Sequence, residues 1–163
     1  MLFPSSSFTV LLIWSAASIV ANSNFVRVVL DTNVLISASL KPGGLEAAVV
    51  KAVLAGDVEA WVTDPVWAEY EEVLARPKFA GVLDASQRML DGLRTRVQRT
   101  TAEIVASAAL DEDDNRFLEC AAAAEAAFLV TGNLRHYPAE FGCTRMVNAR
   151  GFAAASGLLQ EPA

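Results

Sequence analysis

The chain has 163 residues, of which 53% are hydrophobic and 20% are charged, and its formal net charge is −6. This length suits one domain and is too short for two, and the composition excludes a chain that is mainly disordered. The acidic balance argues against a protein that coats nucleic acid non-specifically, although it allows a cleft that carries local cations.

An apolar N-terminal extension precedes the folded domain, which we expect over 25–160. Residues 1–24 contain no charged side chain, and the apolar run over 8–21 has the length of a signal-peptide core, too short for a stable membrane span. No basic residue precedes this run. We therefore favour an upstream extension of a cytoplasmic protein, and an export signal stays open as the alternative.

The first predicted strand ends at a carboxylate. Residues 26–30 are rich in β-branched side chains, which predicts a strand buried on both faces, and Asp31 follows at its C-terminal end. Ligands bind at that edge of an open parallel sheet. An ionised aspartate beside apolar residues needs a cation or hydrogen bonds, and the alternative is an Asp31 that only caps the next helix. Thr32 and Asn33 are expected to cap that helix.

Strands and helices alternate along the rest of the chain, with short connections between them. Hydrophobic spacing predicts helices over 45–55, 65–76, 84–98, from the acidic segment 111–114 to 127, and 151–159. Strands are predicted over 59–63, 102–106, 128–131 and 146–149. The 65–76 helix has a specific start signal, an N-cap Asp64 followed by Pro65. The alternation predicts an α/β fold with a mostly parallel central sheet flanked by helices.

Acidic residues collect near the expected C-terminal edge of this sheet. Glu69 lies close to the buried face of the 65–76 helix, and four consecutive acids over 111–114 stand directly before a later helix. One or two acids are favoured at a helix N-terminus, but four exceed that need, and a divalent cation would relieve their repulsion. Oxygen ligands without clustered His or Cys favour hard cations such as Mg²⁺ or Mn²⁺, which indicates phosphate chemistry.

Four segments, taken in order, resemble the PIN-domain family, in particular the VapC-like ribonuclease toxins of type II toxin–antitoxin pairs. They cover 28–36, 69–79, 111–118 and 130–133. The resemblance implies a PIN-like three-layer fold, a Mg²⁺ or Mn²⁺ cofactor, RNA as the substrate and a small antitoxin protein as a partner. It also implies metal-binding catalytic roles for Asp31, Glu69 and Asp114. Asn133 stands where the family often has a fourth aspartate, and its uncharged amide oxygen should bind a second ion more weakly.

Further residues are assigned to the surroundings of these acids. Asn33 and Thr131 are expected to orient them through hydrogen bonds, with capping of strand ends as the alternative. Asp111 is a reserve metal ligand. Contacts with RNA are assigned to Arg116, Arg135 and His136, and for His136 packing within its own loop stays open.

Two other functions stay open beside the nuclease. A PIN-like fold that has lost catalysis, because of Asn133, would be a binding module. A phosphatase or phosphotransferase with Asp31 as its nucleophile is less favoured, because such enzymes usually carry a second acid two residues later, where this chain has Asn33. Apolar helix faces also make a homodimer a candidate assembly.

Overall fold

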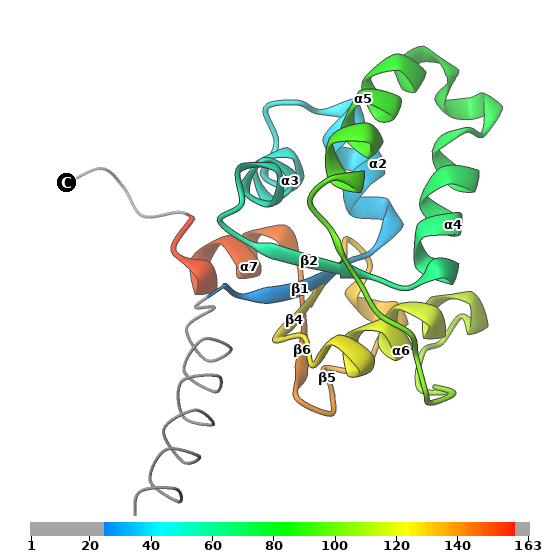
Figure 1. Cartoon of the computed structure of the whole chain (residues 1–163), viewed down its shortest axis with the longest axis vertical. Coiled ribbons are helices and arrows are strands. Elements are labelled where there is room, and N and C mark those ends of the chain that lie inside the picture. The colour runs from blue at the N-terminus through cyan, green and yellow to red at the C-terminus, as the bar shows by residue number, and fades with distance from the viewer. Residues whose placement is uncertain (1–24, 159–163) are drawn as a thin grey trace, which may run out of the picture.

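A six-stranded sheet runs through the centre of the protein, which a computed structural model describes for residues 25–158 (Figure 1). The strand order is β3-β2-β1-β4-β6-β5, and every neighbouring pair is parallel except β5 and β6. The strands are β1 (Arg27–Leu30), β2 (Glu59–Val62), β3 (Gln98–Arg99), β4 (Phe128–Val130), β5 (Glu140–Phe141) and β6 (Thr144–Val147). The predicted α/β fold with a mostly parallel sheet is confirmed.

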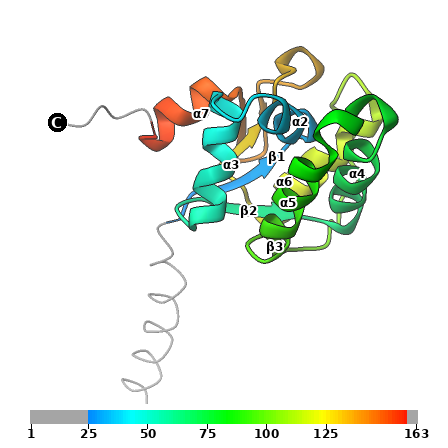
Figure 2. The same cartoon turned by 90° about the horizontal axis from the view of Figure 1, so that it is seen from above.

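Helices flank this sheet, with α2 and α3 above β1 and β2 in Figure 1 and α6 below them. Seen from above, α3 and α7 lie toward one end of the protein, and α4 and α5 lie toward the other (Figure 2). The α-helices are α2 (Thr32–Leu40), α3 (Leu45–Ala55), α4 (Asp64–Leu74), α5 (Leu83–Arg94), α6 (Asn115–Ala124) and α7 (Ala149–Ser156). Three 3₁₀ turns accompany them among the described residues: η1 (Pro77–Val82), η2 (Glu112–Asp114) and η3 (Leu134–His136).

The central strands are buried on both faces, as their β-branched sequences predict. Val28 and Val29 of β1 are fully buried, and α6, which carries the fully buried Phe117, packs against this strand. The register places Leu30 beside Val130 of β4. The two strands therefore end at the same level, and the residues that follow them emerge side by side at one edge of the sheet.

The strand predicted over 102–106 is wrong. α5 ends at Arg94, and the edge strand β3 lies at Gln98–Arg99, at the end of the predicted 84–98 helix. Residues 102–106 are irregular, and Val105 within them is 92% exposed. Their apolar side chains thus do not form the buried face of a strand.

Two predicted helix caps are also wrong. Asp31, not Thr32 or Asn33, occupies the N-cap position of α2, although its side chain makes no capping hydrogen bond, and the side chains of Thr32 and Asn33 bond to other residues. α4 is capped by Thr63, whose Oγ1 accepts a hydrogen bond from the N–H of Val66 at 3.4 Å, and Asp64 is the first helical residue.

The C-terminal elements are displaced by a few residues from their predicted bounds. α6 stops at Ala124 because Glu125 adopts a left-handed conformation with φ of 49°. β6 and α7 begin earlier than predicted, at Thr144 and Ala149. The two-residue strand β5 is too short to show a hydrophobic pattern, and it was not predicted.

Membrane insertion was not expected for the folded domain, and within 25–158 there is no helix with the length and apolar character to cross a bilayer. The predictions for residues 1–24 and for positions beyond 158 lie outside the described residues.

Candidate functional site

The three acids that the sequence singled out come together at the C-terminal edge of the sheet. Asp31 follows β1, Glu69 projects from α4, and Asp114 ends η2 directly before α6. Burial raises the pKa of Glu69 and that of Asp114, and the charge of Asp31 raises both further. α4 is fastened to this edge by the hydroxyl of Tyr70, which donates a hydrogen bond to the carbonyl of Leu30. Asp31, Glu69 and Asp114, which are distant in sequence, thus lie close enough for their charges to interact, and we call these three residues the acidic cluster.

Asp31 is the most enclosed of the three acids, with 5% of its surface exposed. Three side chains donate hydrogen bonds to its Oδ2: the hydroxyls of Thr131 at 2.8 Å and Tyr137 at 3.0 Å, and the amide of Asn33 at 3.1 Å. Burial raises the pKa of Asp31, and hydrogen bonds from the side chains of Thr131 and Tyr137 and from the backbone of Asn33 and Thr32 lower it without cancelling the effect. The carboxylate is therefore held in one orientation at a cost in desolvation, and Oδ1 receives none of these three donors.

Thr131 and Asn33 join the ends of β1 and β4 around Asp31. Thr131 is fully buried, and its Oγ1 accepts a hydrogen bond from the N–H of Asn133 at 3.0 Å while donating to Asp31. The Oδ1 of Asn33 accepts the N–H of Gly132 at 2.8 Å. These contacts have the geometry that an orienting role requires.

Tyr137 is a site residue that the sequence reasoning missed. Its side chain is buried, and its hydroxyl donates to Asp31. Burial raises the pKa of Tyr137 far above its ordinary value, and the charges of Asp31 and Asp114 raise it further, so the hydroxyl remains protonated. Tyr137 directly follows His136, and its place shortly after a strand end among polar residues was the only signal in the sequence.

Glu69 is held by a hydroxyl and by a guanidinium group. Its Oε1 accepts a hydrogen bond from Thr32 at 2.8 Å, and its Oε2 pairs with Nη1 of Arg116 at 3.1 Å. Arg116 also donates to the backbone carbonyl of Asp113 at 2.8 Å and to its carboxylate at 2.9 Å. Arg116, which we predicted to contact RNA, forms an ion pair with Glu69.

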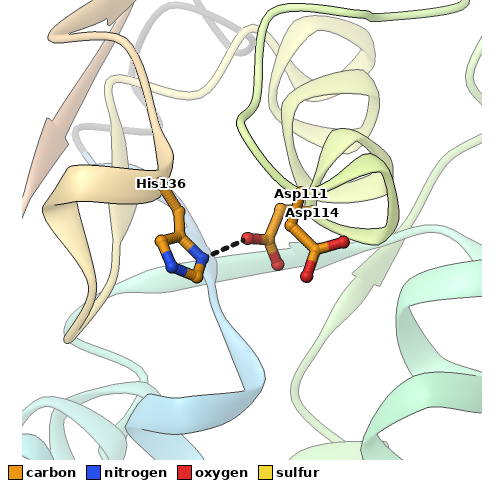
Figure 3. Close-up of side chains that lie close together, drawn as sticks. All are labelled: Asp111, Asp114 and His136. Carbon is orange, nitrogen blue, oxygen red and sulfur yellow. Dashed lines mark hydrogen bonds and ion pairs between the residues drawn. The ribbon is translucent and has the colours of Figure 1, made fainter.

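Asp114 lies in a second group of side chains with Asp111 and His136 (Figure 3). Its Oδ2 lies 3.0 Å from Nδ1 of His136, and one potential ligand atom from each of the three residues lies within 4.8 Å of the others. The amide nitrogen of Asn133 is 3.0 Å from Nε2 of the same ring. Asn133 thus contacts His136 rather than Asp31 or Glu69, and Arg135 is exposed.

A cavity of about 320 Å³ lies next to this cluster, on the side of Arg116. It is lined by Pro65, Val105, Ala106, Glu112, Asn115, Arg116 and Glu119. The three acids do not line it, whereas Arg116, which pairs with Glu69, does.

Comparison with known proteins agrees with this architecture. The family model of the PIN domain matches residues 27–135, which make up more than half of the chain. A solved structure, VapBC2 from Rickettsia felis bound to a DNA fragment from their promoter, shares the fold with a TM-score of 0.51 at 16% sequence identity. The match covers 75% of this chain and 98% of that one. No curated protein matches the sequence. On the extent of the domain match, together with the fold, the chain belongs to the PIN-domain family.

Proposed function

We propose that the protein is an endoribonuclease that hydrolyses RNA phosphodiesters with a divalent cation held by Asp31, Glu69 and Asp114. The observation that carries this proposal is the convergence of three carboxylates with raised pKa values at the C-terminal edge of a parallel sheet. Structural carboxylates seldom need such an arrangement, whereas a cation site does. The PIN-domain match supports the same conclusion.

The donor set fits a divalent cation. Each of the three carboxylates is partly or wholly removed from water, and Glu69 alone is paired with an arginine. Asp111 lies beside Asp114 and adds to the negative charge, which raises the pKa of Asp114 after the larger effect of burial. A divalent ion would balance this charge, and carboxylate oxygens are ligands that Mg²⁺ and Mn²⁺ prefer.

The side chains around the acids have separate tasks in this proposal. Thr131, Tyr137 and Asn33 fix Asp31 through Oδ2, and we assign the cation to Oδ1. Thr32 and Arg116 fix Glu69. A bound cation would polarise the phosphodiester, favour attack by water and stabilise the leaving oxygen. Rigid placement of the carboxylates avoids the cost of gathering them for each reaction.

We further propose that the protein acts as the toxin of a toxin–antitoxin pair, with a small antitoxin protein as its partner. The support is family membership and the fold shared with the VapBC2 structure from Rickettsia felis, which contains promoter DNA. A cytoplasmic location and a homodimer stay predictions.

One competing function is a PIN-fold binding module without catalysis. The feature that favours it is Asn133, which supplies no charge where the family often has an aspartate. Against it, Asn133 contacts His136, and the three acids keep their own partners. Loss of the fourth charge therefore leaves the group formed by Asp31, Glu69 and Asp114 complete.

RNA cleavage by the purified full chain tests the nuclease. We expect Mn²⁺-dependent cleavage that EDTA stops, and a loss of at least about a hundredfold in Asp31→Asn and in Asp114→Asn, because each removes a charged cation ligand. Asp57→Asn is the matched control, since Asp57 is exposed and precedes β2 at the opposite edge of the sheet. Cleavage that survives in both site variants would overturn the assignment, and absence of cleavage with intact RNA binding would favour the binding module.

A further inference from the structure

The chain contains a single histidine, and it lies in the second group, with Asp111 and Asp114. Nδ1 of His136 is 3.0 Å from Oδ2 of Asp114, and Asp111 completes a set of three side chains whose ligand atoms lie within 4.8 Å of one another. Figure 3 shows the imidazole on η3 facing two carboxylates that come from the segment before α6. A nitrogen donor therefore stands among oxygen donors.

The backbone fixes the two segments that carry these side chains. The N–H of Leu110 donates to the carbonyl of His136 at 2.8 Å, and the N–H of Asp114 donates to the carbonyl of Asp111 at 3.1 Å. Oδ1 of Asp111 accepts a hydrogen bond from the N–H of Asp113 at 3.0 Å, which holds this carboxylate in place. The three side chains can thus meet a ligand without rearrangement of the chain.

Asn133 occupies the far side of the imidazole, 3.0 Å from Nε2. The oxygen and nitrogen of an asparagine amide can exchange places by a half-turn. With Oδ1 toward the ring, Asn133 would accept a hydrogen bond from Nε2–H, which leaves the electron pair of Nδ1 free to bind a cation shared with Asp114. Histidines that bind metals commonly donate their other N–H to an oxygen acceptor in this way.

We propose that Asp111, Asp114 and His136 form a mixed nitrogen and oxygen site for a transition-metal dication, with Nδ1 as a ligand and Asn133 as the residue that orients the ring. This inference shares Asp114 with the proposed nuclease centre and rests on the proposed function only there. Two carboxylates and a neutral imidazole match the charge of a dication. Because imidazole binds Mn²⁺, Co²⁺ and Zn²⁺ better than Mg²⁺, the site discriminates against Mg²⁺.

Mn²⁺ itself is the probe that tests this site. The full chain, free of any histidine tag, is loaded with Mn²⁺ without RNA and studied by electron spin-echo spectroscopy. We expect modulation from a directly bonded imidazole nitrogen, which only His136 can supply, and we expect it to persist in about a hundredfold excess of Mg²⁺. Bound Mn²⁺ without the nitrogen signal, or no bound Mn²⁺, would overturn the inference.

Three variants separate metal binding from simple positioning of Asp114. His136→Asn keeps an amide N–H near the position of Nδ1 but removes the imidazole, so the nitrogen signal should vanish and Mn²⁺ affinity should fall about tenfold or more. Asp111→Asn should weaken affinity similarly while keeping the signal. Arg135→Gln, a change at the exposed neighbour of His136, should alter neither. Unchanged affinity in both site variants would refute the inference.

The outcomes for the two proposals are distinguishable. RNA cleavage that depends on Asp31, in a chain whose Mn²⁺ shows no nitrogen signal, leaves the nuclease intact and overturns the mixed site. A nitrogen signal in a chain that does not cleave RNA supports the mixed site and overturns the nuclease. If His136→Asn fails to fold, the spectrum of the wild-type chain alone decides, since there is no second imidazole in the sequence.

Discussion

Replacing Asp31 by asparagine should make the metal-free protein more stable. The carboxylate is 5% exposed and accepts three side-chain hydrogen bonds. A bond to a charged group contributes about 1.5–3 kcal/mol and a neutral one about 0.5–1.5 kcal/mol, so neutralisation loses about 3 kcal/mol over three bonds. Desolvation of a buried ion costs several kcal/mol. The raised pKa of Asp31 means that burial outweighs the bonds that oppose it.

The net gain for Asp31→Asn should be about 1 kcal/mol, which corresponds to about 2–4 °C in melting temperature for a chain of this size. Saturating Mn²⁺ should reverse the order, because a ligand at a hundred times its Kd stabilises the wild-type chain by about 2.7 kcal/mol and the variant has lost a ligand group. Thermal unfolding in EDTA and in Mn²⁺ measures both effects, and Asp57→Asn should follow the wild type in each.

The decisive result is the reversed order of the melting temperatures of variant and wild type between EDTA and Mn²⁺. If Asp31→Asn were less stable than the wild type in EDTA, the hydrogen bonds would outweigh desolvation and the explanation of the raised pKa would be wrong. If Mn²⁺ stabilised variant and wild type equally, Asp31 would not belong to the cation site.

Three further predictions concern the site and a helix end. Burial raises the pKa values of Asp31, Glu69 and Asp114 in the folded protein. Protonation of these groups therefore stabilises the fold. This stabilisation is fully present at a pH below the pKa values of the unfolded chain, and it is lost as the pH rises through the pKa values of the folded protein. Relative to Asp31→Asn, the metal-free wild type should therefore gain melting temperature from pH 7 to 5, and a relative loss would contradict this sign. Tyr137→Phe removes a hydrogen-bond donor from Asp31, so the pKa of Asp31 should rise further and the acidic limb of the pH–rate profile should move to higher pH. An acidic limb at the same pH would exclude the role of Tyr137 in stabilising the ionised Asp31. Glu125→Gly relieves a left-handed residue and should raise the free energy of urea unfolding by about 0.5–1 kcal/mol with or without Mn²⁺, whereas a decrease would show that no strain is stored there.

The parts of the fold that were predictable from sequence are those whose burial is two-sided or periodic. β1 and β4 have short apolar runs that only a central strand explains, and the strand-end position of Asp31 follows from them. α4 has clear three- and four-residue spacing, which identified Glu69 as the acid near the buried face. Local pattern and tertiary burial agree in these elements, so the sequence carries the answer.

The remaining errors arise where the local pattern and the tertiary contacts differ. An edge strand of two residues such as β3 has too few positions for a hydrophobic pattern. Val105 is β-branched, which favours a strand prediction, but its side chain is exposed. Asn33 has the chemistry of a cap, but contacts with Asp31 and Gly132 engage its side chain instead. Tyr137 reaches Asp31 because the strand before it, β4, pairs with β1, and spacing along the sequence does not reveal that approach.

The bond between the N–H of Leu110 and the carbonyl of His136 gives the protein a built-in reporter. It joins the loop before α6 to the turn after β4, and Leu110 is 79% exposed. The protection of this amide against exchange with deuterium should therefore report the free energy of separating the two loops. A single backbone amide would thus report the stability of the contact between the two loops that carry Asp111, Asp114 and His136, even in variants that no longer act on any substrate.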